Sequence, residues 1–380
     1  MRDAKPPSRR AWTLRILLAT LILASLVAGI SGGLLRAGVG MPWTGSRWLG
    51  AAAVDHAFLM ICAFMGSVIA IERAVAVKRP WAFVGPVASA SAGALALNGW
   101  EPPAAWLAVV AAAAFIVVNS TIVLRQKADH TIMLLVAAVA WAVGCLLHAL
   151  GGPAESVIAW WLAFLVLTVA AERLEMTRVM RRRRGAAPAL HATVGLLILG
   201  AASSGLVPVP GGILYGLSLA GLAIWLLTFD IAWRTVRAPG LSRYMALCLL
   251  MGYFWLLVAG AAWAATSVGL PFRDAALHGV ALGFVFSMVL GHAPVVLPAI
   301  ARVKVRYGRL FYVPLALLHG SLALRLLGAP LDASALMKGA AGNAIAIAVF
   351  AATVGGSAIA WRLQHRSSQT RHRHGNTADH

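Results

Sequence analysis

Long apolar segments alternate with short polar ones along the whole of this chain. A helix that crosses a bilayer needs about 20 apolar residues, and a window of about that length locates twelve such segments. They are centred near Ala24, Met65, Ser89, Ala113, Ala140, Phe164, Leu197, Leu222, Met251, Phe286, Leu318 and Ala348. The pattern therefore predicts an all-α, polytopic membrane protein with 12 transmembrane helices.

Composition supports this prediction and changes how the charge is interpreted. Of the 380 residues, 61% are hydrophobic and 12% are charged, which is far more apolar surface than a soluble domain needs. The net charge of +20 would suggest nucleic-acid binding in a soluble protein. In a membrane protein the basic residues instead orient the loops, so we expect no nucleic-acid partner.

The basic residues lie mostly on one side of the predicted spans. With a cytoplasmic N-terminus, the lysines and arginines that fall outward are Arg36, Arg47, Arg273, Arg325 and Lys338, out of 32 in total. Short loops rich in Lys and Arg stay in the cytoplasm. We therefore expect both termini to be cytoplasmic and the protein to lie in a bacterial inner membrane, in contact with membrane lipid.

The chain leaves little room for an extramembrane domain. Its longer polar segments are the first ten residues, a basic linker at Arg178–Pro188 and the tail after Trp361. We expect residues 1–361 to form a single 12-helix domain and residues 362–380 to form a disordered cytoplasmic tail. The first span, Ala11–Leu35, has the basic flank of a secretory signal, but its length favours a retained helix.

A weak internal repeat suggests how the helices are grouped. The second span ends in Ala70–Ala74 (AIERA) and the sixth, four spans later, ends in Ala170–Leu174 (AAERL). Gly291-His292 occupies the comparable place in the tenth span. Three units of four helices would explain this spacing, and chance similarity of two short segments is the alternative.

The repeated Glu-Arg pairs have two interpretations. Glu72 and Glu172 each precede an arginine near the inner surface, so Arg73 and Arg173 could contact the acidic groups of a cofactor or mark a proton entry. The favoured interpretation is structural, because ion pairs between neighbouring repeats cost little near the membrane surface.

Two histidines at equal depth are the strongest candidates for chemistry. His56 and His278 both lie roughly 6 to 8 Å below the outer surface, in the second and tenth spans. Imidazoles facing each other from two helices would suit axial ligation of a haem iron. Arg325, near the outer end of the eleventh span, could pair with a propionate or simply reach the interface. The alternative is that each histidine bonds a neighbouring helix.

A second histidine pair lies deeper, toward the inner side. His292 and His319 match in depth, and Pro294 removes the amide that would bond the carbonyl of Leu290. The backbone beside His292 should therefore kink, which membranes tolerate where protein groups or a cavity satisfy the freed carbonyl. A second metal, a proton route or a polar packing site would each fit this pair.

The cysteines are few and lie within spans. Cys62, Cys145 and Cys248 belong to different helices, so no disulfide framework of loops is expected. Buried thiols are the simplest interpretation. Cys145 and His148 are three residues apart, which is a weak signal for a soft metal.

Two stretches resemble a known family. Residues 55–64 (DHAFLMICAF) resemble the histidine-containing motif in the second helix of the NnrS family, whose members have twelve helices. Residues 278–283 (HGVALG), continuing through Met288 to Leu290-Gly291, are similar to the motif of its tenth helix. The resemblance carries His56 and His278 over as ligand candidates. The chain departs from the family at Phe58 and Leu59, where the family has a histidine and a glutamate.

The resemblance implies a fold, a cofactor and a role. The fold would be a pseudo-threefold bundle like that of haem-copper oxidases, and the cofactor haem b, with copper as a second metal. The role would be a response to nitric oxide or respiratory stress by binding a gas, transferring electrons or detoxification, with oxidoreductase-like activity left open. The alternative function is a proton-coupled permease for a small molecule or a metal, using the same histidines and the Pro294 break.

Overall fold

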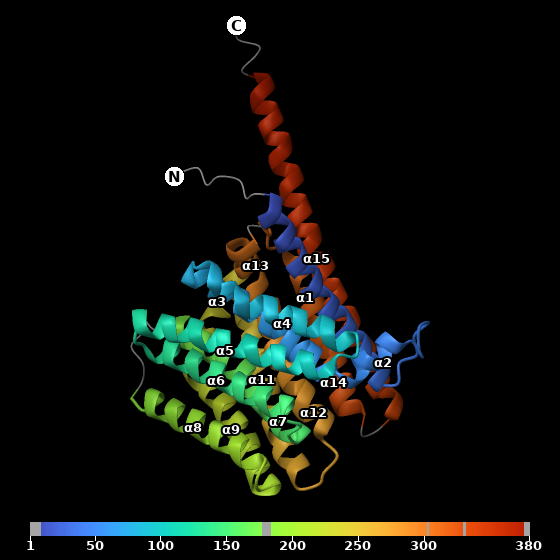
Figure 1. The fold of residues 1–380 in the computed structure, drawn as a ribbon. Helices are drawn as coiled ribbons and strands as arrows, with labels where there is room; N and C mark the ends of the chain where they lie inside the picture. Colours follow the sequence, from blue (N-terminus) through green and yellow to red (C-terminus); the bar gives the residue numbers. More distant parts are fainter. Residues whose placement is uncertain (1–8, 177–183, 302–303, 330–331, 376–380) are drawn as a thin grey trace. The chain divides into compact units, whose positions relative to one another are not determined.

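Helices make up nearly all of the described part of the chain in this computed structural model (Figure 1). The structure describes residues 9–176, 184–301, 304–329 and 332–375, and within these ranges there is no strand. The helices are α1 (Arg9–Arg36), α2 (Arg47–Val54), η1 (Phe58–Gly66), α3 (Ser67–Val77), η2 (Pro80–Phe83), α4 (Val84–Leu97), α5 (Glu101–Arg125), α6 (Asp129–Ala149), α7 (Ala154–Met176), α8 (Ala186–Ser204), α9 (Pro208–Phe229), α10 (Ala232–Thr235), α11 (Leu241–Ser267), α12 (Arg273–His278), η3 (Gly279–Phe286), α13 (Ser287–Ala301), η4 (Arg309–Phe311), α14 (Tyr312–Gly328) and α15 (Ala333–Gly375).

The twelve predicted spans are confirmed. Twelve helical stretches among the described residues are long and apolar enough to cross a membrane, and each of the twelve predicted centres lies inside a different one. Three spans combine two helical types, because η1 continues into α3, η2 into α4, and η4 into α14. A fourth span joins α12, η3 and α13. The chain is therefore an all-α, polytopic membrane protein.

The contacts divide the chain into two compact units. The N-terminal unit comprises residues 1–181, 187–218 and 267–270, and the C-terminal unit comprises residues 182–186, 219–266 and 271–380. Each unit is described below by itself. The grouping into three units of four helices stays a prediction.

The N-terminal unit is built on helices that are consecutive in the chain. Helices α4, α5, α6 and α7 pack in that order, and η1 packs against α1, α4 and α7 (Figure 1). At the centre, Trp141 stacks on Phe164 with ring centroids 4.9 Å apart, and Phe115 meets both rings edge-on. These three aromatic side chains are fully buried, so they fix α5, α6 and α7 to one another.

The repeated Glu-Arg pairs form an ion pair in the N-terminal unit. Nη2 of Arg73 lies 3.1 Å from Oε1 of Glu172 and 3.6 Å from Oε1 of Glu72. The structural interpretation is therefore confirmed for Arg73, which joins the second span to the sixth. Residues 178–183 of the predicted basic linker lie outside the described residues.

Two buried segments depart from regular α-helix. Residues of η1 and η3 form π-helix, which proteins seldom use for more than one turn. In each segment a glycine faces a tryptophan: a Cβ on Gly66 would come within 2.5 Å of Trp141, and one on Gly283 within 2.4 Å of Trp255. The wide turns thus bring backbone against large rings. Hydropathy could not indicate these π-helical segments, because it measures how well a segment suits the membrane and not which helices contact each other.

The carbonyl freed by Pro294 has a protein partner in the C-terminal unit. Helix α13 continues through Pro294, and the hydroxyl of the buried Tyr244 donates to the carbonyl oxygen of Leu290 at 3.2 Å. Tyr244 thus replaces the amide that proline lacks. This is the kind of compensation that a proline within a membrane helix requires.

The C-terminal tail differs from its prediction. Helix α15 runs to Gly375, so the structure continues the helix through most of the segment 362–380 that we predicted to be disordered, and residues 376–380 lie outside the description. The physical reason is that extending an existing helix needs no new nucleus, and the segment contains no proline and no glycine before Gly375.

Candidate functional site

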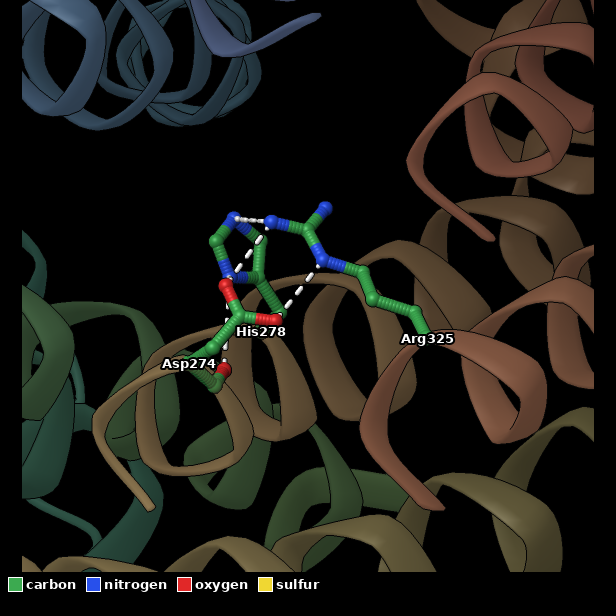
Figure 2. A network of polar contacts seen from close by, with 3 residues as sticks. All are labelled: Asp274, His278 and Arg325. Carbon is green, nitrogen blue, oxygen red and sulfur yellow. Dashed lines mark hydrogen bonds and ion pairs between the residues drawn. The ribbon is translucent and has the colours of Figure 1, made fainter. Parts of the chain in front are cut away.

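A carboxylate, an imidazole and a guanidinium meet in the C-terminal unit (Figure 2). Asp274 and His278 lie one turn apart on α12, and Arg325 reaches them from α14. Nδ1 of His278 is 2.8 Å from Oδ1 of Asp274. Arg325 donates from Nη2 to Oδ1 and from Nε to Oδ2 of Asp274, both at 2.8 Å. This paired geometry is the strong form of an arginine–carboxylate contact.

The contacts of His278 indicate which of its ring nitrogens accepts a hydrogen bond. Nη2 of Arg325 lies 3.3 Å from Nε2 of His278, and a guanidinium can only donate. Nε2 must therefore accept, so the proton of a neutral imidazole is on Nδ1 and is donated to Asp274. A carboxylate behind Nδ1 holds the ring in this tautomer and makes Nε2 a stronger electron donor.

A pocket of about 250 Å³ opens beside the carboxylate and the guanidinium. Asp274 and Arg325 line it together with mostly apolar residues, which are Pro271, Phe272, Ala275, Leu326, Ala329 and Leu336. The side chains of Asp274 and Arg325 are 33% and 10% exposed. A small molecule in this pocket can therefore reach the carboxylate and the guanidinium.

Helix α15 positions the arginine. A Cβ on Gly339 would lie 2.5 Å from Cβ of Arg325 and 2.6 Å from its Cα and N. The two helices therefore approach closely at the residue that carries the guanidinium, and only glycine leaves enough space there.

Gly339→Ala is expected to push α14 away at Arg325 and to destabilise the protein by about 2 kcal/mol, because overpacking forces the backbone to shift. The measurement is the unfolding midpoint in detergent. Gly355→Ala is the matched control on the same helix, since a Cβ there meets nothing within 4 Å. Equal midpoints for the two variants would contradict this role of Gly339.

The other ligand candidate, His56, is held by α1 in the N-terminal unit. Its Nδ1 lies 2.7 Å from the carbonyl oxygen of Gly29, so Nδ1 donates this hydrogen bond. A Cβ on Gly33 would lie 2.7 Å from the imidazole ring. Burial, and then the carboxylate of Glu101, raise the pKa of the adjacent Asp55 to about 6. The bond to a neighbouring helix that the sequence offered as an alternative is thus present.

His56 and His278 share two features although they belong to different units. Each imidazole has its Nδ1 beside an oxygen acceptor, and each is followed within two residues by a buried π-helical segment. Such segments are frequent at functional sites. No sequence pattern considered above indicated this second feature.

In the deeper histidine pair, His319 belongs to a buried network of hydrogen bonds between helices. The indole Nε1 of Trp255 donates to Nδ1 of His319 at 2.9 Å, so Nε2 carries the proton and donates to Oγ of Ser287 at 3.2 Å. Ser287 in turn donates to the carbonyl oxygen of Cys248 at 2.7 Å. Both ring nitrogens of His319 therefore bind protein groups, which agrees with the third interpretation of this pair.

His292 has a local partner. Its Nδ1 donates to the carbonyl oxygen of Met288 at 2.8 Å. Among the described residues, no three side chains of His, Cys, Asp or Glu come close enough together to hold a metal ion. The proposed metal role of His292 and His319 stays a prediction.

Sequence reasoning overlooked Asp274 and the glycines of α1. A search for charged partners one turn from each histidine would have found Asp274, four residues before His278. The spacing of Ser25, Gly29 and Gly33 is a small-residue pattern of close helix packing in membranes. Both signals were present in the sequence.

The fold and the site define a class: a polytopic α-helical membrane protein with a histidine–carboxylate–arginine cluster formed by two of its spans. A family model described as "Domain of unknown function (DUF8744)" matches residues 15–359, and the chain belongs to this family. The comparison with curated proteins gives no match, and neither does the comparison with solved structures.

Proposed function

We propose that this protein binds haem b in the membrane, with His278 as a residue that would hold it and His56 as a second ligand candidate. The observation that carries the proposal is the Asp274 carboxylate behind Nδ1 of His278 at 2.8 Å. Imidazoles that ligate metals commonly donate their second N–H to a carboxylate or a backbone carbonyl. His56 has the second kind of partner, the carbonyl of Gly29.

The contacts of His278 with Arg325 and Asp274 are compatible with a bound haem. The contact from Arg325 to Nε2 of His278 is 3.3 Å, at the long end of hydrogen bonding, whereas its two bonds to Asp274 are 2.8 Å. Ligation at Nε2 would replace the long contact and could leave the arginine–carboxylate pair intact. Arg325 would then remain close to the ligand, where a guanidinium suits a propionate.

In this role each residue has a distinct task. Asp274 keeps the His278 proton on Nδ1 and raises the electron density at Nε2, and Arg325 supplies positive charge at the pocket. Bound haem would supply reversible one-electron chemistry or a binding site for a small gas such as nitric oxide. Copper at His292 and His319 is a further part of the same hypothesis, and elemental analysis of the purified protein tests it.

An absorption spectrum tests the proposal. We expect the full chain, purified in detergent after expression with added haem, to show a Soret band, and His278→Ala and His56→Ala each to lose most of it. His191→Ala is the matched control, because His191 is exposed at the start of α8 and should leave the spectrum unchanged. A colourless wild-type protein, or both variants retaining the full band, would rule the proposal out.

A proton-coupled permease is the second candidate, and the pocket beside Asp274 and Arg325 favours it. A small solute could displace Arg325 from Asp274 there, and His278 could accept the proton on Nε2. This function predicts uptake into proteoliposomes driven by a pH gradient, without bound pigment. Asp274→Asn should abolish that uptake, whereas His191→Ala should not.

A further inference from the structure

Two thiols from different spans face each other in the N-terminal unit. Sγ of Cys62 on η1 and Sγ of Cys145 on α6 are 3.9 Å apart, and both residues are at most 1% exposed. Their sequence separation is 83 residues, so the fold and not the local sequence brings them together. This pair takes no part in the site described above.

An indole is placed against one of these sulfurs. Nε1 of Trp141 donates to Sγ of Cys62 at 3.5 Å. Trp141 precedes Cys145 by one helical turn on α6, and its ring is stacked on Phe164. The donor is thus held rigidly. The indole N–H is therefore placed to donate to the negative charge that Sγ of Cys62 carries when this sulfur acts as the nucleophile in disulfide exchange.

The net charge of the product decides whether the Cys62–Cys145 pair can bind a metal ion or form a disulfide. A monovalent soft metal held by two thiolates would leave a net negative charge among apolar groups, which is costly without a paired cation. No third His, Cys, Asp or Glu side chain of the described chain completes a metal-binding group with these two. A disulfide is neutral, so the same apolar surroundings tolerate it.

We propose that Cys62 and Cys145 are a modification site that forms a reversible disulfide by exchange with small, uncharged organic disulfides. The Cys62 thiolate attacks one sulfur of the reagent, and the reagent's own S–S bond breaks to release one thiolate. The Cys145 thiolate then attacks Cys62 and releases the second. Two electrons pass from the protein to the reagent, and the two protons end on the released thiols.

The product would connect the second span to the fifth. The two sulfurs must approach by about 2 Å to reach the length of an S–S bond. Cys145 lies one turn from the end of α6, and both thiols are buried, so the exchange requires a small opening of that helix end. The bond would tie η1, the segment that follows His56, to α6. The proposal does not depend on haem.

The experiment treats the intact protein in detergent with 4,4′-dithiodipyridine, a small uncharged disulfide. We expect two thiopyridones per protein, a loss of two hydrogens in mass, and a cross-linked peptide pair containing Cys62 and Cys145. Cys145→Ser should stop at a single adduct on Cys62. Trp141→Phe should slow the reaction about fivefold, the effect of losing one hydrogen bond of about 1 kcal/mol.

Three results would overturn the proposal. The first is two unmodified thiols at Cys62 and Cys145 after prolonged treatment of the folded protein. The second is separate adducts on the two cysteines without a cross-link. The third is a cross-link that involves Cys248 instead. Cys248→Ala, which removes the third thiol, should leave the cross-link between Cys62 and Cys145 unchanged.

Discussion

Gly32→Ala is expected to separate α1 from α2 and to destabilise the protein by about 3 kcal/mol, at the upper end of overpacking effects. A Cβ on Gly32 would lie 2.1 Å from the carbonyl oxygen of Ala52, 2.3 Å from its carbon and 2.7 Å from the amide nitrogen of Ala53. These are backbone atoms, which cannot rotate away as a side chain can. The unfolding midpoint of the full chain in detergent measures the effect.

The same substitution should disturb His56, because Gly29 and Gly33 on the same helix bond and contact its ring. Gly50→Ala on α2 is the control, since a Cβ there meets nothing within 4 Å. We expect this control to be neutral or slightly more stable, because alanine favours helix over glycine. If both variants unfolded alike, the close approach of α1 and α2 would be disproved.

Arg73→Ala is expected to destabilise the protein by about 3 kcal/mol, because it removes the cation that Glu172 faces within the helix bundle. The Arg73 side chain is 10% exposed and that of Glu172 is 28% exposed, so water can compensate only partly. Glu72 lies 3.6 Å from the same guanidinium and would also lose its partner. The measurement is again the unfolding midpoint in detergent.

A double-mutant cycle made of Arg73→Met, Glu172→Leu and the double variant separates the pair from its surroundings. Arg73→Met with Glu172→Leu should regain most of the lost stability, because replacing both charges by apolar groups removes the cost of burying them. Nε of Arg73 is buried without a hydrogen-bond partner among the described residues, which lowers the net value of the pair. A double variant as unstable as Arg73→Ala would contradict this account.

The sequence predicted His278 and Arg325 as candidate site residues but did not predict that they contact each other. His278 and Arg325 were recognisable as ionisable groups at one end of apolar spans, where such groups are usually functional. Their meeting at 3.3 Å, and the role of Asp274 between them, depends on how α12 and α14 pack. Gly339 on α15 lets that helix approach α14 at Arg325, and nothing local in the sequence of α14 indicates this.

The pairing of His56 with His278 shows what residue counts from the membrane surface can and cannot predict. Residue counts from the membrane surface place two side chains at the same height but leave their rotation about each helix open. For His319 the sequence offered three interpretations, and the contacts with Trp255 and Ser287 favour polar packing. Rotation and partner choice are set by side chains on other helices.

The sequence by itself determined the number and the approximate positions of the twelve spans, because a bilayer forces each apolar segment into a helix that satisfies its own backbone. It also predicted ion pairs between the repeated Glu-Arg motifs, and in the structure Arg73 forms one with Glu172. Only the tertiary structure decided the π-helical segments, the Asp274–His278–Arg325 cluster and the approach of Cys62 to Cys145. The reason is that hydropathy depends on each segment alone, whereas these features depend on which side chains of distant segments come together.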